Sequence, residues 1–594
     1  MDRSNPLAKG DFAEEMFRTA SHAYVSFAEI WRSSYGVDIR RRGLDVNRAL
    51  SIAGPENLAE LLEGTDMIAA EVKRLGLLPA GDNGTYFQTL PYHLRKFTNH
   101  SRLTVDGNPL VWNTDFVAVP GQRAPRPIAG AEVVFGGTQG DSTTQISAAD
   151  AAGKFVVLLP NPNGPRGGQG QAFAVRGGAA PARSRFDDAV AIATIDLDPL
   201  TPAQRVAVNE PIVATTSAPG RGAPAGAARG PVDSIALLKA QLATLQPQAT
   251  IRLTREAAAR LFKRSNIDGL SAGLKGGTVT ASLDFVDTPT DWARNVVAVV
   301  PGSDPVLKYQ YVAIGAHNDH VGMVGNNPAE HDSLRAFNKV MRPQGANDRP
   351  GPPTAEQWAE ITALITKARS IRPPRLDTVM NGADDDGSGS VAVQEIAELL
   401  STMKVKPKRS TLFVWHVGEE KGLWGSKFFT EHSTVSRDSI VAQLNIDMVG
   451  RGSATDLTGS SKEGQDLRGG PDYLQLVGSR RLSTELGDLV ERVNTSKKHN
   501  LVFDYGMDAN EHPMNIYCRS DHYEYAKWGV PVTFFTTGGH SAYHQLTDEP
   551  QYIDYAHMTR VAKLIADVAL DLGSRAGRPV VNQPKLDPRG TCKQ

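Results

Sequence analysis

The sequence predicts an α/β fold in which a mixed, mostly parallel sheet is covered by helices on both faces, with a β-rich domain inserted into the chain. After about residue 290, unbroken Val, Ile, Leu and Phe runs alternate with helical stretches, which is typical of strands buried on both faces. Between residues 108 and 285 the composition shifts toward Gly, Ala and Pro, with short β-like runs. With 594 residues, the chain is too long for a single core.

These changes divide the chain into four parts. The predicted parts are 1–107, an N-terminal helical segment and the start of the α/β domain; 108–285, the inserted β-rich domain; 286–575, the rest of the α/β domain; and 576–594, a C-terminal tail. Within the α/β domain, residues 323–380 form a polar, Pro-rich insertion. Such a long connection is usually a functional loop or a disordered one, so we expect a lid or rim over a cleft.

The expected elements follow in chain order. Residues 55–77 repeat apolar side chains at spacings of three and four, which predicts a helix, and 81–94 indicate a turn and a strand. Further strands are expected at 154–160, 189–197, 211–217, 295–302, 311–317, 410–417, 440–448 and 531–537. Further helices are expected at 354–371, 388–403 and 555–573. The Gly-rich stretches 164–185 and 217–231 carry too little apolar surface to order firmly.

The composition excludes several classes of protein. Lys and Arg (64) balance Asp and Glu (65), so there is no basic field of the kind that recruits nucleic acid or acidic membranes. No apolar run is long enough for a membrane span, and the first residues lack the apolar core of a signal peptide. Only Cys518 and Cys592 occur, which excludes a disulfide-dense scaffold and a Cys-based zinc site. Any metal site must therefore use His, Asp and Glu.

Carboxylates and histidines gather where the predicted strands end. Glu419 and Glu420 follow the strand at 410–417, and open α/β sheets place their chemistry at the carboxyl ends of strands. An isolated Glu pair is more often a solvated turn. This pair has company, because four other segments carry residues of metal-ligand type. They are His317 and Asp319 in 311–322, the Asp run in 381–390, Asp447 in 445–450, and His540 with His544 in 538–550.

The residue types suggest a division of roles. His317 suits a metal ligand, and Asp319 can orient its second ring nitrogen. The Asp run precedes a helix, so helix capping competes there with a carboxylate that bridges two cations. Adjacent side chains on a strand-end turn point in different directions, so one of Glu419 and Glu420 can bind a metal while the other faces its bound water.

Six segments, taken in order, resemble the M28 family of zinc aminopeptidases, in the subgroup whose catalytic domain carries an inserted protease-associated (PA) domain. The segments are GAHNDHVG, NGADDDGSG, GEEKGLWGS, LNIDMVG, SDHYEYAKWGVP and AYHQLTDEP. The resemblance covers most of 290–573, with weaker similarity over 55–100. It implies a zinc-exopeptidase fold, a PA-like domain at 108–285 and two Zn²⁺ per chain. A ligand set without thiolates also suits Zn²⁺, and leaves Mn²⁺ or Co²⁺ open.

The resemblance also assigns residues. It implies five zinc ligands: His317 and Asp447 for one ion, Glu420 and His544 for the other, and Asp385 as the bridge. Glu419 takes the position of the general base, Tyr543 that of a hydroxyl donor to the developing oxyanion, and Asp319 that of the acid that orients the histidine. A cis peptide bond is implied between Asp385 and Asp386.

The implied function is a metal-dependent exopeptidase, foremost an aminopeptidase that removes N-terminal residues from peptides. A dipeptidase or carboxypeptidase on the same scaffold is the first alternative. It needs a cation for the free carboxylate, and Arg451 and Arg519 lie near ligand segments. A non-catalytic peptidase-like binding protein is the second alternative. Family habit implies a secreted or periplasmic location. Residue specificity and oligomeric state stay open.

The remaining candidates have structural interpretations. His320, His416, His522 and His540 lie near the motifs, and each is more often a packed core histidine than a ligand. Of these, His522 is kept as a supporting residue of the site. Cys518 lies just before the SDHYEY segment, where a free thiol is an open alternative with no evident role.

Overall fold

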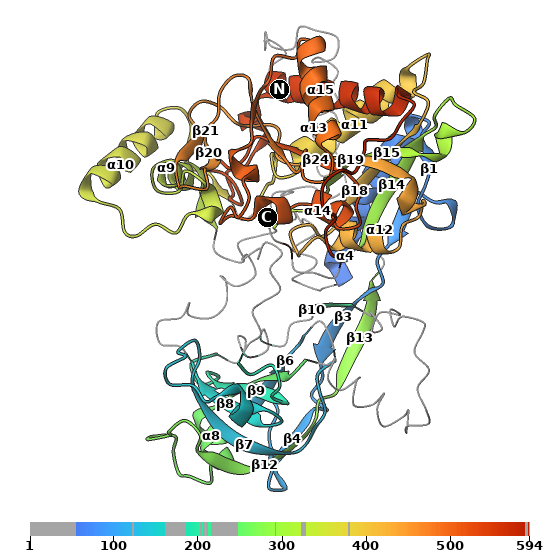
Figure 1. The fold of residues 1–594 in the computed structure, drawn as a ribbon. Coiled ribbons are helices and arrows are strands. Elements are labelled where there is room, and N and C mark those ends of the chain that lie inside the picture. The colour runs from blue at the N-terminus through green and yellow to red at the C-terminus, as the bar shows by residue number, and fades with distance from the viewer. Residues whose placement is uncertain are drawn as a thin grey trace, which may run out of the picture.

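The computed structural model describes most of the chain from residue 55 onward (Figure 1). The described residues are 55–121, 124–160, 185–201, 205, 208, 212–215, 247–290, 293–321, 328–377, 380–588, 592 and 594. The expectations for residues 1–54, for 164–184 and for 217–231 lie outside them.

The larger unit is built on a nine-stranded mixed sheet, as the sequence predicts. Its order is β1 (Leu78–Pro79), β14 (Arg294–Val300), β18 (Ser410–His416), β15 (Tyr311–His317), β19 (Ile440–Ile446), β24 (Val532–Thr536), β22 (Tyr473–Val477) and β23 (Val502–Asp504), with β2 (Phe87–Thr89) also paired to β14. The central strands β18, β15, β19 and β24 are parallel neighbours. Antiparallel pairings to β14 and β22 flank them. The carboxyl ends of the four central strands therefore share one edge of the sheet.

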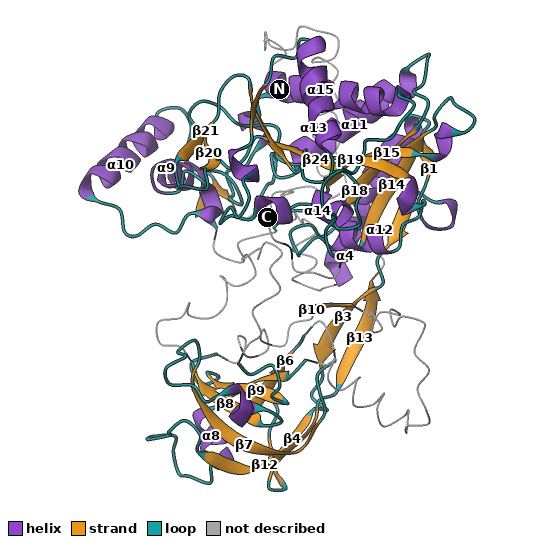
Figure 2. Cartoon of the chain, viewed as in Figure 1, coloured by secondary structure: helices purple, strands orange, loops and turns teal. Residues whose placement is uncertain are grey.

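Helices cover both faces of this sheet (Figure 2). One face packs against α4 (Pro55–Arg74), α11 (Gly387–Thr402), α13 (Thr484–Ser496) and α15 (Tyr555–Ser574), and the other against α12 (Trp424–Glu431) and α14 (His522–Ala526). Successive residues of β14 alternate between the two cores: Val296 and Ala298 face the first, and Val297 the second. This two-residue alternation with both faces buried explains why the strands are continuously apolar.

The β-rich unit has its own sheet and its own core (Figure 1). The strand order is β5 (Asn108–Leu110), β4 (Arg102–Val105), β12 (Lys275–Ser282), β7 (Ile128–Thr138), β8 (Phe155–Leu159), β9 (Ala191–Ile195), β11 (Ala249–Leu253) and β6 (Phe116–Val119). Helices α5 (Ala148–Ala151) and α8 (Arg255–Leu261) accompany it. Because β4 belongs to this sheet, the unit starts slightly before the predicted boundary at 108. Its assignment as a PA domain stays a prediction.

A narrow three-stranded ribbon connects the two units (Figure 1). It consists of β10 (Ile212–Thr215), β3 (Tyr92–Phe97) and β13 (Phe285–Thr290), with β3 in the middle. The chain therefore leaves the larger unit on β3 and returns on β13, as an inserted domain requires. The other short elements are β20 (Leu457–Ser460), β21 (Asp466–Arg468) and the 3₁₀ turns η2 (Asp82–Gly84), η3 (Leu307–Tyr309), η5 (Arg437–Ser439), η6 (Gly506–Asp508), η7 (Ile516–Cys518) and η8 (Pro550–Tyr552).

The insertion 323–380 contains more regular structure than the single helix predicted. Its elements are β16 (Ala329–Glu330), α9 (His331–Met341), η4 (Gly345–Asn347), α10 (Ala355–Arg369) and β17 (Leu376–Asp377). The predicted helix is α10, which begins with a capping box between Thr354 and Gln357. Helix α9 was missed although Leu334, Phe337 and Met341 repeat at helical spacing and the carboxylate of Glu330 caps its start by accepting from the amides of Asp332 and Ser333.

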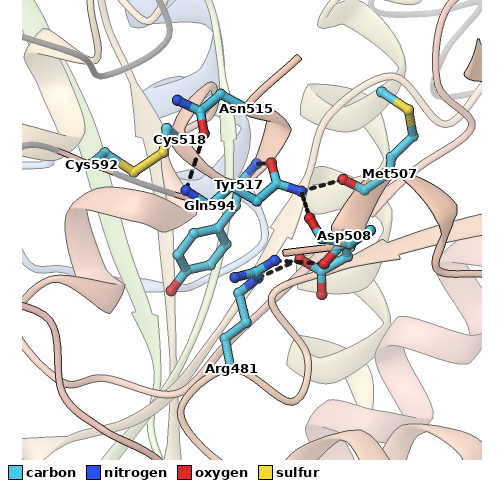
Figure 3. Close-up of a disulfide and its surroundings, with 9 residues drawn as sticks. Arg481, Met507, Asp508, Asn515, Tyr517, Cys518, Cys592 and Gln594 are labelled. Atoms are coloured by element: carbon cyan, nitrogen blue, oxygen red, sulfur yellow. Dashed lines mark hydrogen bonds and ion pairs between the residues drawn. A yellow bond between two sulfur atoms is a disulfide. The ribbon is translucent and has the colours of Figure 1, made fainter. Parts of the chain in front are cut away.

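A disulfide joins Cys518 to Cys592, with their Cα atoms 5.9 Å apart (Figure 3). The open alternative of a free thiol at Cys518 is therefore wrong. Both residues are buried in the core on the α12 and α14 side of the large sheet. Among the described residues, no helix combines the length and the apolar character that a membrane span requires.

Candidate metal centre and active site

The predicted ligands converge at the shared carboxyl edge of the central strands. His317 is the last residue of β15, Glu420 follows β18 and Asp447 follows β19. Asp385 lies just before α11, and His544 lies in the loop after β24. The register pairs His317 with His416, the last residue of β18, so the turn that carries the two glutamates starts beside His317. All five predicted ligands are buried.

The ligand atoms form two groups that share Asp385. In the first, His317 Nε2 lies 3.2 Å from Asp385 Oδ1 and 3.7 Å from Asp447 Oδ1. In the second, His544 Nε2 lies 2.9 Å from both Asp385 Oδ2 and Glu420 Oε1. Each oxygen of Asp385 thus faces a different histidine. A carboxylate that bridges two cations would have this arrangement.

His320 belongs to the second group, although the sequence indicated a structural histidine. Its Nδ1 lies 3.1 Å from Glu420 Oε1 and 3.8 Å from Asp385 Oδ2. Together with His544, these residues present ligand atoms that all lie within 4.8 Å of one another. The available signal was the spacing of His317 and His320 around Asp319 in one strand-end loop, since a turn can return a side chain to the same edge.

The donor set fits divalent cations. His317 Nε2, His320 Nδ1, Asp385 Oδ2 and Glu420 Oε1 are buried and have no hydrogen-bond partner. Buried polar atoms are rarely left unpaired, and four that converge at one place are suited to bind a cation. Imidazole and carboxylate ligands without thiolates are typical of zinc sites, with three protein ligands and an open position in catalytic ones.

The two adjacent glutamates have opposite charge environments. Burial raises the pKa of both carboxyls, but the His544 charge and the close contacts with His320 and His544 bring the pKa of Glu420 down to about 2. Burial raises the pKa of Glu419 well above its ordinary value, the His317 charge opposes this shift, and the Glu420 and Asp447 carboxylates add to it. Neighbouring carboxyls with diverging pKa values are typical of a division into ligand and proton carrier.

Asp319 acts on its neighbours differently from the expectation. His317 Nδ1 lies 3.0 Å from the backbone oxygen of Asp319, and 3.6 Å from its carboxylate. The carboxylate instead accepts from the backbone amides of Glu419 (3.1 Å) and Glu420 (3.3 Å). The backbone carbonyl therefore directs the Nδ1 proton of His317 and leaves Nε2 free as a ligand. The Asp319 side chain fixes the turn that carries both glutamates.

The Asp run combines both roles proposed for it. Asp386 caps α11 by accepting from the amide of Gly389 at 2.9 Å, as the capping alternative proposed. Asp384 accepts from the amide of Gly450 and faces His540 Nε2 at 3.1 Å. Only the central Asp385 points into the ligand groups. The peptide bond between Asp385 and Asp386 is cis, as the resemblance implies.

The other predicted histidines lie outside the ligand groups. His540 pairs with Asp384, which agrees with its structural interpretation. His416 is buried, with Nε2 3.0 Å from the Tyr525 hydroxyl. The His522 ring stacks on Phe534 at 4.8 Å between centroids, and burial lowers the pKa of His522 to about 3. It therefore packs behind the pocket and contacts none of the ligands in the two groups.

A pocket of about 80 Å³ opens beside the ligand groups. Its lining includes the acidic residues Glu419 and Asp447 and the apolar residues Met507, Met514 and Ile516, which we call the apolar wall. Its other lining residues are Gln344, Asn347, Asp385, Glu420, Met448, Thr458, Gln475, Arg519, Ser520, Phe534, Thr536, Gly538, Gly539, Tyr543 and His544. The pocket thus combines carboxyl groups of the candidate metal centre with apolar side chains.

Tyr543, the predicted hydroxyl donor, lines the same pocket. Its ring stacks on that of His544 with 4.0 Å between centroids, and Arg519 Nη2 donates to its hydroxyl oxygen at 3.2 Å. Burial raises the pKa of Tyr543 well above its ordinary value, the Arg519 charge opposes this shift, and nearby carboxylates add to it. Tyr543 is therefore a hydroxyl donor over the physiological pH range. Arg451, the other predicted cation, lies instead over the ring of Tyr552.

Part of the chain is similar in sequence to known peptidases. Residues 295–569 match the sequence model of peptidase family M28. Leucine aminopeptidase 1 of Sclerotinia sclerotiorum is 28% identical over 32% of this chain and 46% of its own length. Leupeptin-inactivating enzyme 1 of Streptomyces exfoliatus is 40% identical over 13% of this chain and 18% of its own length. The chain spans about half or less of the length of these curated relatives.

Two solved structures align with nearly the whole chain at low similarity. The aminopeptidase of Aneurinibacillus sp. strain AM-1 is 16% identical with a TM-score of 0.40 and covers 97% of both chains. The zinc aminopeptidase BSAP of Bacillus subtilis is 14% identical with a TM-score of 0.42, over 94% of this chain and 95% of its own. The fold and site define a domain with a buried cluster of imidazole and carboxylate groups, a candidate metal centre, at the edge of a mixed sheet. The residues of this domain are the ones that match the model of peptidase family M28.

Proposed function

We propose that the protein is an aminopeptidase that uses two zinc ions to hydrolyse the first peptide bond of its substrates. One observation carries the proposal: Asp385 directs its two oxygens to two histidine-containing groups, and Glu419 lies beside them without belonging to either. His317 and Asp447 would hold one ion, and His544 and Glu420 would hold the other, with Asp385 as a ligand to both. Bound there, the ions would polarise a carbonyl and lower the pKa of a water.

The residues of the chain supply the proton transfers and the orientation. Glu419 has a raised pKa, so it takes a proton readily and can pass it to the leaving amine. Tyr543 donates its hydroxyl hydrogen to the carbonyl oxygen as negative charge develops there. The Arg519 N–H bond to the Tyr543 oxygen leaves that hydrogen free to point into the pocket. Asp319 holds the turn that sets the position of Glu419.

The charge of the pocket favours a free amine over a free carboxylate. Its lining includes Glu419, Asp447 and Asp385, whose carboxylates would attract an ammonium group. The candidate carboxylate clamp, Arg519, is already bonded to Tyr543. Hydrolysis of dipeptides that are either N-blocked or C-amidated distinguishes an aminopeptidase from a carboxypeptidase. We expect cleavage of the C-amidated and not of the N-blocked substrate, and the reverse result would favour the carboxypeptidase alternative.

The apolar wall points to substrates with a large apolar first residue. Met507, Met514 and Ile516 line the pocket, and two of these three carry flexible thioethers that adapt to branched side chains. Several relatives are named leucine aminopeptidases, which supports the same preference. We expect leucine and methionine reporter substrates to be cleaved faster than glutamate or lysine ones. Equal cleavage rates for all four substrates would contradict the proposed role of this wall in substrate selection.

The contrast between the two glutamates tests the mechanism. Glu419→Gln keeps the shape and removes the base, so zinc content should stay normal while kcat falls by about 10²–10⁴-fold. Glu420→Gln is the matched control, because it alters the neighbouring carboxylate that we assign as a ligand. It should lose zinc as well as activity. Near-normal turnover of Glu419→Gln, or normal zinc in both variants, would contradict these assignments.

The disulfide supports the expected location. Disulfides persist in oxidising compartments and are rare where thiols are kept reduced. The Cys518–Cys592 bond therefore supports a secreted or periplasmic protein, which agrees with peptide substrates met outside the cytosol. Thiol titration of protein isolated from its native source, under denaturing conditions, tests this inference. Two free thiols per chain would contradict it.

A further inference from the structure

The insertion reaches the pocket directly. Its 3₁₀ turn η4 (Gly345–Asn347) follows α9, and Gln344 and Asn347 beside and within this turn line the pocket. Helices α9 and α10 lie at the flank of the larger unit (Figure 1). Among the described residues of the insertion, those that line the pocket lie in or next to the turn between these helices.

This turn is packed against the backbone of Tyr543. The amide of Ala346 donates to the Tyr543 carbonyl oxygen at 3.0 Å. Gly345 has φ +59°, and a Cβ atom placed on it would lie 2.4 Å from the Tyr543 oxygen and 2.9 Å from the Tyr543 nitrogen. Real Cβ contacts are never that short, so any side chain at position 345 must displace backbone. Only glycine allows the turn to sit this close.

The insertion contacts the loop from Tyr543 to Glu549 at further points. Asn338 Nδ2 donates to Gln545 Oε1 at 3.0 Å, and both residues are buried. His331 Nε2 lies 2.7 Å from Glu549 Oε2, and Arg375 Nη2 lies 2.6 Å from the other oxygen of that carboxylate. Burial alone would raise the pKa of Glu549, but hydrogen bonds from His331 and Arg375 lower it. The carboxylate is therefore charged, and the insertion holds the loop from Tyr543 to Glu549 along its length.

We propose that the turn Gly345–Asn347 is a positioning element for Tyr543, with Gly345 as its key residue. The inference rests on the donor role proposed for Tyr543. On one side the loop is fixed by His544, which the ligand group holds at φ +52°, and on the other side by the insertion. The place of the Tyr543 hydroxyl follows from its backbone and from the bond to Arg519. A displacement of about 1 Å can cost on the order of 10²-fold in rate.

The test compares two glycines of the same insertion. Gly345→Ala adds one methyl group against the Tyr543 backbone, whereas Gly351→Ala adds it where no atom lies within 4 Å. We expect kcat of Gly345→Ala to fall by about 10–100-fold with KM within about threefold of the wild type. Zinc content should be normal in both variants. Gly351→Ala should match the wild type.

A double-mutant cycle shows whether Gly345 acts through Tyr543. In the Tyr543→Phe background the hydroxyl is already absent, so Gly345→Ala should cause little further loss of kcat. Additive losses in the double variant would overturn the positioning role. An active wild type whose Gly345→Ala and Gly351→Ala variants are equal would also overturn it. A zinc-loaded wild type that cleaves no free-amine substrate would instead overturn the proposed function, and this inference with it.

A second pair of variants covers the case in which Gly345→Ala does not fold. The amide of Gln344 donates to Asp348 Oδ2 at 2.7 Å, which closes the turn without touching Tyr543. Asp348→Ala removes this acceptor and adds no atoms, so kcat should fall at normal zinc content. Asp348→Asn keeps an oxygen at the same place and should restore most of the rate. Equal rates for Asp348→Ala and the wild type would overturn the proposal.

Discussion

Breaking the Cys518–Cys592 disulfide should lower the free energy of unfolding by about 4 kcal/mol. The two cysteines are 74 residues apart in sequence, so the bond closes a long loop in the unfolded chain. In the chain-entropy treatment, a loop of that length removes about 15 cal/mol/K from the unfolded ensemble, or about 4.5 kcal/mol near 25 °C. Such a loss is a large part of the total stability of a typical protein.

The assay is urea unfolding of the zinc-free protein, followed by tryptophan fluorescence. A phosphine reductant is suitable, because thiol reductants bind zinc and would complicate later activity measurements. The wild type is compared with and without reductant, and the Cys518→Ala/Cys592→Ala double variant is treated in the same way. Oxidised wild type should be the most stable form, and the reductant should leave the double variant unchanged. A fully reduced wild type, verified by thiol titration, within about 1 kcal/mol of the oxidised form would refute the reasoning.

The same bond should affect catalysis through the pocket wall. Gln594, two residues after Cys592, accepts from the amide of Tyr517 at 3.0 Å and donates to the backbone oxygens of Met507 and Ala509 (Figure 3). These contacts hold the segment that supplies Met507, Met514 and Ile516 to the pocket. Reduction should therefore raise KM for a leucine substrate more than it lowers kcat, because the metal ligands lie outside this segment.

Three further predictions follow from single sites. His320→Ala should weaken binding of the second zinc ion by about tenfold or more in competition with a chelator, and unchanged affinity would remove His320 from the centre. Met514→Asp should lower kcat/KM for leucine substrates while sparing kcat for alanine ones; a parallel loss on both would contradict its place in the wall. The pKa values of Glu330 and Glu549 are lower in the folded protein than in the unfolded chain. Their ion pairs therefore stabilise the fold above the ordinary carboxyl pKa of about 4.3, and this stabilisation is lost as the pH falls toward the lowered pKa values of the folded protein. Protease cleavage in the insertion should accordingly rise below about pH 4, and cleavage independent of pH would contradict this.

The sequence predicted that the candidate ligands gather at one edge of the sheet, because local sequence patterns mark the position of each of them. Each ligand follows a recognisable apolar strand or precedes a recognisable helix, and parallel neighbours bring their carboxyl ends together. His320 was not predicted as a ligand, because a single histidine is more often a packed core residue. Its closeness to Glu420 depends on how the loop after the strand folds in three dimensions. The Asp319 carboxylate was expected to orient His317, and in the structure it lies 3.6 Å from His317 Nδ1 but accepts hydrogen bonds from two backbone amides.

Other features depend on long-range geometry that no local pattern reports. The disulfide requires two Cα atoms within about 7 Å, and 74 intervening residues carry no information about that distance. Helix α9 has an amphipathic pattern, but the partners of its buried polar residues His331 and Asn338 are Glu549 and Gln545, which lie far along the chain. Tertiary contacts therefore add to the stability of this helix in a way that its own sequence does not show.

The acidic residues around the candidate metal centre have two kinds of role. The acidic residues that face inward present oxygens to the ligand groups. The acidic residues that face outward accept hydrogen bonds from neighbouring loops that carry candidate ligands. Asp386 accepts from the amide of His317 and from that of Met448, which follows the ligand Asp447. Asp319, next to His317 along the strand-end loop, fixes the turn of the two glutamates. Because each outer carboxylate joins two strand ends, losing one should displace two ligands together, even though the outer carboxylate lies in neither ligand group.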